Sequence, residues 1–133
     1  MKITRKSEYA CLAIIDLARN YKKGLLTIRE LAERNNIPKK YLEQILLHLK
    51  NAGFVSSVRG KSGGYKLSKS PKEITVAEVI RIIDGPIAPV ESVSENYYEH
   101  TPAEQNEELI SLFEKIRECT VNILEKTTFQ EMS

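Results

Sequence analysis

The residues best suited by type and spacing to contact a ligand lie within six consecutive positions, Lys39 to Gln44, in a chain of 133 residues. Lys40 can donate to guanine, Gln44 can pair with adenine, and Glu43 can accept from cytosine in the major groove of duplex DNA. Lys39 and Tyr41 are placed nearer the flanking phosphates. Taken alone, these residue types are more typical of a solvated helix face than of a DNA-binding one. A second signal is therefore needed to decide between the two interpretations.

A glycine-rich basic segment supplies that second signal. From Arg59 to Lys72 there are five cations and no acidic residue. Glycines let backbone N–H groups approach a phosphate closely, and Arg59 can enter a minor groove or clamp the DNA backbone. An ordinary turn is the alternative, but a basic hairpin directly behind two helices is more typical of a DNA-binding wing. The candidate DNA-binding residues are Lys39, Lys40, Tyr41, Glu43, Gln44, Arg59, Gly60, Lys61, Ser62, Gly63, Gly64 and Tyr65.

Capping signals and apolar periodicity predict the helices that hold these candidates. Thr27 and Glu30 form a capping box, which predicts a short helix that ends at Asn35-Asn36. Pro38 suits the first turn of a second helix, and Gly53 is a natural stop at its end. Two helices joined by a turn of about four residues predict a helix-turn-helix. The second helix has a predicted buried stripe of Leu42, Ile45, Leu46 and Leu49.

The pattern changes to strands after this helical pair. Residues 54–58 and 64–67 are predicted strands around a glycine turn, which together make a β-hairpin wing. Apolar periodicity predicts a first helix over residues 7–21, and a second capping box opens a short helix over residues 75–84. The predicted fold class is mainly α with a small β-hairpin wing: a winged helix-turn-helix domain plus a long C-terminal dimerisation helix.

The C-terminal part of the chain has a different character. Residues 86–101, rich in Pro, Ser and Glu, are predicted to form a linker loop. A third capping box, residues 101–104, is expected to start a long helix that runs to about Lys126. The chain therefore divides into a DNA-binding domain (1–85), the linker, and a dimerisation helix with its tail (102–133). The helix has a coiled-coil-like seam that a partner subunit would bury, made of Leu109, Leu112, Phe113, Ile116, Cys119 and Ile123.

The formal net charge of +2 hides an asymmetry between the two parts of the chain. Residues 1–85 hold 17 Lys and Arg against 8 Asp and Glu, whereas residues 86–133 hold 3 against 10. Only the first part is therefore expected to meet a polyanion such as DNA. No apolar run approaches the roughly 18 residues of a membrane span, and the basic N-terminus is not followed by a signal-peptide apolar region. Cys11 and Cys119 match no metal spacing, and we expect reduced thiols in a cytoplasmic protein.

Two other classes of function are less well supported by the sequence. An enzyme is not expected, because neither His48 nor His100 lies near a nucleophile pattern, and Gly60 to Gly64 joins two strands rather than a strand and a helix. An interaction module is the stronger alternative: the acidic C-terminal helix would bind a metabolic enzyme, and DNA binding would be secondary. Salt-dependent binding to duplex DNA separates the two, because a DNA-binding protein loses affinity steeply as salt rises.

Several short motifs occur across essentially the whole chain: Met1-Lys2-Ile3-Thr4, Tyr41-Leu42-Glu43-Gln44, Asn51-Ala52-Gly53-Phe54-Val55, Val58-Arg59-Gly60 with Gly63-Gly64-Tyr65, Ile74-Thr75-Val76 and Asp84-Gly85. Together they resemble the Rrf2 family of bacterial transcriptional regulators. The resemblance implies a sequence-specific DNA-binding regulator, expected to be a repressor, that acts on a two-fold symmetric operator. It also implies a homodimer with swapped long C-terminal helices, in agreement with the apolar seam.

One departure from the family pattern concerns its cofactor. Cluster-binding members have three cysteines in the loop before the long helix, but residues 85–101 contain none and have Ser92 and Ser94 instead. Hydroxyls are poor ligands for iron–sulfur clusters, so we expect no cluster, no other metal and no cofactor. Residues 85–91 are similar to the cluster-free repressors of cysteine metabolism. This resemblance alone implies a cysteine-biosynthesis enzyme as a protein partner.

Overall fold

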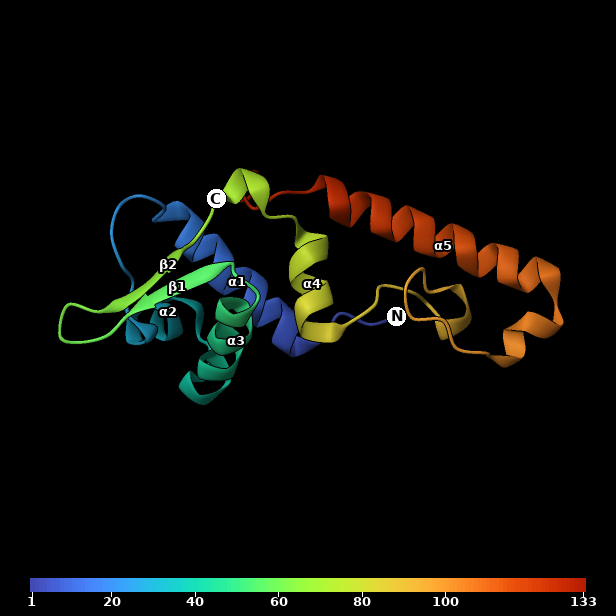
Figure 1. Cartoon of the computed structure of the whole chain (residues 1–133), viewed down its shortest axis with the longest axis horizontal. Helices are drawn as coiled ribbons and strands as arrows, with labels where there is room; N and C mark the ends of the chain where they lie inside the picture. The colour runs from blue at the N-terminus through green and yellow to red at the C-terminus, as the bar shows by residue number, and fades with distance from the viewer.

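The computed structural model describes residues 1–133 and contains five α-helices and one β-hairpin (Figure 1). The first helices and the hairpin form a body at one end of the molecule. The loop after the fourth helix leads away from this body, and the long last helix runs back toward it (Figure 1). No helix has the length and apolar character needed to cross a membrane. In chain order the elements are α1 (Arg5–Arg19), α2 (Ile28–Asn35), α3 (Lys39–Asn51), β1 (Val55–Val58), β2 (Gly64–Leu67), α4 (Val76–Asp84) and α5 (Glu107–Lys126).

The main core is a cluster of buried side chains from α1, α2, α3, the hairpin and α4. Ile14 and Leu17 of α1 and Leu31 of α2 are at most 1% exposed, and they meet the apolar stripe of α3. Burying a side chain of this kind contributes roughly 1.5–3 kcal/mol relative to leaving it in water. The predicted fold class, mainly helical with a two-stranded wing and a long C-terminal helix, is confirmed.

Capping interactions set where the helices begin and end. Helix α1 begins two residues before the predicted start, because the Thr4 side chain accepts from the Ser7 backbone N–H at 3.2 Å. Only half of the predicted capping box of α2 forms: the Thr27 hydroxyl accepts from the Glu30 N–H at 3.0 Å, but the Glu30 carboxylate accepts from that hydroxyl rather than from the Thr27 N–H. Asn36 ends α2 in the left-handed conformation with φ of 52°. The second capping box is complete: the Thr75 hydroxyl accepts from the N–H of residue 78, whose carboxylate accepts from the Thr75 N–H.

The hairpin pairs β1 with β2 in antiparallel register, from Val55 opposite Leu67 to Val58 opposite Gly64. Gly63 is required by a close approach, because a Cβ at this position would lie 2.1 Å from the backbone oxygen of Val58.

The third predicted capping box, residues 101–104, is wrong. Residues 102–105 form a separate short 3₁₀-helix, and α5 begins at Glu107 with Asn106 as its cap. The Thr101 side chain makes no cap because its hydroxyl is paired with that of Ser92 at 2.5 Å. The chain is extended at Asn106, with φ of −134°, so the two helices cannot be continuous.

The C-terminal tail packs back onto the main core, a contact that has no signal in the sequence. Phe129 is fully buried in the main core. Its N–H donates to the Ile74 oxygen at 3.0 Å, and the Val76 N–H donates to the Thr127 oxygen at 2.9 Å. The tail therefore fixes the end of α5 against the start of α4.

Candidate nucleic-acid interface

Helix α3 has one buried face and one exposed face, as its apolar spacing predicts. Leu42, Ile45, Leu46 and Leu49 are all 0% exposed. The predicted contact residues on the same helix all lie exposed to solvent: Lys39, Lys40, Tyr41, Glu43 and Gln44. The burial of the leucine stripe thus orients the polar face outward.

The buried carboxylate of Asp16 joins α1 to the end of α2. Asp16 of α1 is 9% exposed and accepts from Nη1 of Arg34 at 3.2 Å and from Nδ2 of Asn35 at 3.1 Å. Both donors lie in the last turn of α2, so the turn that leads into α3 is anchored to α1. Aromatic packing adds a second anchor, because the ring of Tyr41 meets that of Tyr9 edge to face with centroids 5.7 Å apart. No local sequence signal marks Asp16, because its partners Arg34 and Asn35 lie 18 and 19 residues further along the chain.

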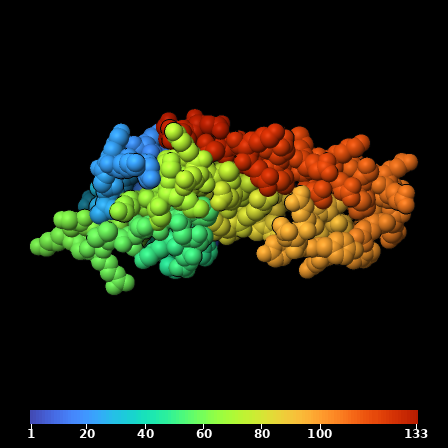
Figure 2. Space-filling model, turned by 45° about the horizontal axis from the view of Figure 1, so that its top comes forward, coloured from blue at the N-terminus to red at the C-terminus, as the bar shows by residue number.

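The wing projects from the body at one end of the molecule (Figure 2). Arg59, Gly60, Lys61 and Ser62 are exposed at its tip. The other three predicted wing residues, Gly63, Gly64 and Tyr65, are partly buried at the base of the tip.

The residues at the base have structural partners of their own. The Gly63 N–H donates to the Gly60 oxygen at 3.0 Å, and the Tyr65 N–H donates to the Leu26 oxygen at 2.7 Å. A Cβ at Gly64 would lie 2.7 Å from the Leu26 oxygen, which explains the glycine there. The tip residues are therefore the part of the wing that is free to approach a phosphate.

The cations of α3 and the wing tip differ from those of α2 in their ion pairing. Arg29 pairs with Glu33 at 3.0 Å, and Arg34 pairs with Asp16. None of the predicted DNA-contacting cations takes part in an ion pair: Lys39, Lys40, Arg59 and Lys61. Cations without a carboxylate partner produce a positive potential that attracts a polyanion.

The predicted dimerisation residues form an exposed apolar stripe on α5. Leu109, Leu112, Ile116 and Ile123 are 39%, 51%, 40% and 58% exposed. Cys119 is exposed as well, and Phe113 is half-buried. The opposite side of α5 has an intramolecular partner, because its Val121 packs in a small cluster with Ala77, Ile80 and Ile87. The stripe has no such partner within the chain.

The donor groups of the chain do not fit an iron–sulfur cluster. Cluster irons require thiolates, and the loop that follows α4 has hydroxyls that are already engaged: Ser92 with Thr101 at 2.5 Å, and Ser94 with the Tyr97 N–H at 3.3 Å. No three His, Cys, Asp or Glu side chains converge as a metal site.

A polar cluster in that loop is formed by Tyr98, His100 and Glu104. Glu104 accepts from the Tyr98 hydroxyl at 2.5 Å and is bonded to His100. The hydrogen bond to Glu104 raises the pKa of Tyr98, and the same bond lowers the pKa of Glu104.

The two cysteines lie in different parts of the fold. Cys11 is half-buried on α1, where burial, followed by the negative charges of Asp84 and Glu8, raises the pKa of its thiol to about 11. At neutral pH Cys11 is therefore almost entirely a thiol, the form that is neither nucleophilic nor metal-binding. Cys119 lies exposed on α5.

An exposed helix of a helix-turn-helix, a basic wing beside it and a long C-terminal helix define a winged helix-turn-helix DNA-binding protein. The family model Rrf2, described as an iron-dependent transcriptional regulator, matches residues 3–133. The chain belongs to this Rrf2 family, as the sequence motifs indicated, and is a DNA-binding transcriptional regulator.

Three relatives support this assignment. The chain is 35% identical over 133 residues to the regulator CymR of Bacillus subtilis, covering 100% of this chain and 90% of CymR. The structure of CymR, titled the global cysteine regulator, superimposes with a TM-score of 0.80 over 99% of this chain and 95% of CymR. An Rrf2-like regulator of Rhodobacter capsulatus is 46% identical over 73% of this chain and 67% of its own length. The structure of T. potens IscR is 30% identical, with a TM-score of 0.77 over 99% of this chain and 85% of IscR. CymR and the Rhodobacter capsulatus relative are both named as regulators.

Proposed function

We propose that this regulator represses transcription as a homodimer bound to a two-fold symmetric operator, without an iron–sulfur cluster. The observation that carries the proposal is the presence of two surfaces in one chain. One is an exposed polar face on α3 with unpaired cations, and the other is an apolar stripe on α5 whose leucine and isoleucine side chains are exposed. The first surface suits DNA and the second suits another copy of the chain.

The polar face of α3 supplies the base contacts. Lys40 donates to guanine, Gln44 pairs with adenine and Glu43 accepts from cytosine, as the geometry of the major groove allows. At the wing tip Arg59 and Lys61 bind phosphates or enter the adjacent minor groove. Repression then follows if the bound dimer excludes other proteins from the same DNA.

The dimer is formed by the apolar stripe of α5. A single chain would leave Leu112, Ile116 and Ile123 in water, and packing them against a second subunit removes that apolar surface. The dimer fixes the distance between two α3 helices, so half-sites should be about one helical turn of DNA, or a multiple of it, apart. The alternative function, in which α5 serves mainly to bind a metabolic enzyme, finds no support among the relatives. A cysteine-biosynthesis enzyme as a further partner stays a prediction from the resemblance alone.

Replacing one residue of the stripe tests this proposal. Ile116→Asp would place an unpaired carboxylate in the apolar interface and should dissociate the dimer. Affinity for a duplex selected from a random pool should fall with it, although every DNA-contacting residue is unchanged. Ser111→Asp, an exposed position on the same helix, is the control that introduces the same charge outside the stripe. Sedimentation at micromolar concentration that shows a persistent Ile116→Asp dimer would refute the proposed assembly.

A further inference from the structure

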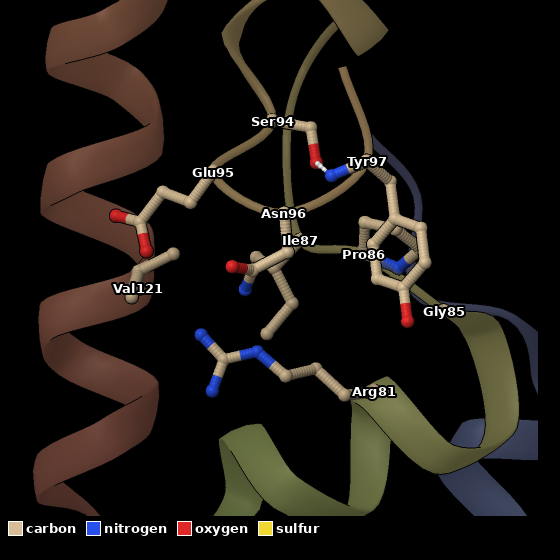
Figure 3. Close-up of a pocket in the computed structure, with 9 residues that line it drawn as sticks. All are labelled: Arg81, Gly85, Pro86, Ile87, Ser94, Glu95, Asn96, Tyr97 and Val121. Atoms are coloured by element: carbon tan, nitrogen blue, oxygen red, sulfur yellow. Dashed lines mark hydrogen bonds between the residues drawn. The ribbon is translucent and has the colours of Figure 1, made fainter.

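A pocket of about 490 Å³ lies between α4, the loop that follows it and α5, away from the DNA-binding surface (Figure 3). We call it the α4–α5 pocket. Its walls come from Arg81 of α4, residues 85–87 and 94–97 of the loop, and Val121 of α5. Because three separate segments meet here, a ligand in the pocket would touch α4, the loop that follows it and α5 together.

The polar side chains of the pocket have unused hydrogen-bonding capacity. Arg81 donates through Nη2 to Glu125 at 2.9 Å, and a guanidinium has five donors in total. Glu95 has one charged partner, the Nε of Arg117, at 3.7 Å. The exposed amide of Asn96 adds both donors and an acceptor. In Figure 3 the guanidinium of Arg81 and the carboxylate of Glu95 both point toward α5, from the two sides of Val121.

The rest of the lining is apolar. Ile87 and Val121 are 5% and 8% exposed and belong to the same small core cluster. Pro86 and the ring of Tyr97 also line the pocket (Figure 3). An aliphatic group of a ligand would be in contact with these side chains, while its charged groups could reach Arg81 and Glu95.

We propose that the α4–α5 pocket binds a small α-amino acid with an apolar side chain and that this ligand regulates DNA binding. The carboxylate of the ligand pairs with Arg81, whose planar donors suit two-point binding, and its ammonium group pairs with Glu95. A nucleotide fits less well, because its phosphates would meet a single cation and a carboxylate. A metal ion also fits less well, because the positive charge of the Arg81 guanidinium would repel it.

Helix α4 connects this pocket to the DNA-binding body. Arg81 lies one helical turn before Asp84, whose carboxylate accepts from the Thr4 N–H at 3.2 Å and from the Thr4 hydroxyl at 2.5 Å. Thr4 is the cap of α1, and α1 carries Asp16, the residue that anchors the turn before α3. A ligand that shifts Arg81 therefore acts on the start of α1. This regulatory step rests on the proposed function, whereas ligand binding itself does not.

Calorimetry on the full-length protein tests binding, with L-leucine as the probe. Two analogues each lack one charge: 4-methylpentanoate has no ammonium group and 3-methylbutylamine has no carboxylate. We expect leucine to bind and each analogue to bind at least about tenfold more weakly, because one charge-assisted hydrogen bond is lost. No heat from leucine at 10 mM ligand, or equal affinity for leucine and either analogue, would overturn the assignment.

Two variants locate the site. Arg81→Gln should abolish leucine binding, but it also removes the contact with Glu125. Asn96→Trp blocks the exposed loop side of the pocket without touching that contact, and it should abolish binding too. Arg19→Gln, an exposed arginine outside the pocket, is the control that keeps wild-type binding. Leucine binding that survives in both pocket variants would place the ligand elsewhere and refute the proposal.

Operator affinity measured with and without leucine tests regulation. We expect leucine to change the operator affinity of the wild type at least threefold and that of Asn96→Trp not at all. If leucine binds but operator affinity does not change, the regulatory half of the proposal is wrong. Failure of the protein to bind any operator, either with or without leucine, would instead contradict the proposed function.

Discussion

The burial of Phe129 predicts how much the C-terminal tail contributes to the free energy of unfolding. The Phe129 side chain is 0% exposed and lies in the same core cluster as the apolar stripe of α3. Phe129→Ala keeps the backbone N–H that donates to the Ile74 oxygen. The loss of unfolding free energy therefore reports the contribution of the side chain alone. Truncation of a buried phenylalanine removes its transfer free energy and leaves a cavity, and the two effects together cost about 3–5 kcal/mol.

Urea unfolding followed by circular dichroism measures this loss. The protein concentration must be held constant, because a dimer gains apparent stability with concentration. Gln130→Ala is the neighbouring control: its side chain is exposed, and surface changes of this kind usually stay within about 0.5 kcal/mol. A loss below about 1 kcal/mol for Phe129→Ala would refute the conclusion that the tail is part of the main core.

Four further predictions concern the DNA-binding surface and the dimer. Asp16→Ala leaves the last turn of α2 without its buried acceptor, so unfolding free energy should fall by about 1–3 kcal/mol and operator affinity should fall too; unchanged operator affinity in a gel shift would contradict the anchoring role. Gln44→Ala should remove about 1–3 kcal/mol of discrimination between operator and random duplex, and equal losses on both would mean that Gln44 makes no base contact. Arg59→Ala should weaken operator binding at matched salt while sedimentation still shows a dimer. Cys119 should react slowly with a thiol reagent in the wild type and rapidly in Ile116→Asp, and equal rates would show that the stripe of α5 is not covered.

The elements whose signals are local could be predicted from the sequence. Thr27 and Thr75 cap helices because a hydroxyl lies three residues before an available N–H, and Asn36 ends α2 because asparagine tolerates the left-handed conformation. The glycines between β1 and β2 indicate a tight reversal of the chain. The apolar spacing of α3 fixed which of its faces is exposed, and therefore which residues are candidates for DNA contact.

The features that were missed depend on pairs of residues far apart in the chain. Thr101 has the sequence of a helix cap, but its hydroxyl is engaged by Ser92, and the competing contact cannot be recognised from the motif. The bonds between Thr4 and Asp84 join residues 80 positions apart. Phe129 carries no periodic pattern, because it is a single apolar residue in a short tail whose partners lie in α4 and the main core.

The most direct test of the central claim is the affinity of the full-length dimer for duplex DNA as a function of salt. Duplexes selected from a random pool should share a two-fold symmetric sequence. The logarithm of their binding constant should fall linearly with the logarithm of salt concentration, with a slope of about −0.9 for each phosphate contacted. Lys39→Ala and Arg59→Ala, each at a position assigned to a phosphate, should make that slope shallower. A pool from which no sequence is enriched, or an affinity that does not change with salt, would contradict the conclusion that α3 and the wing bind DNA.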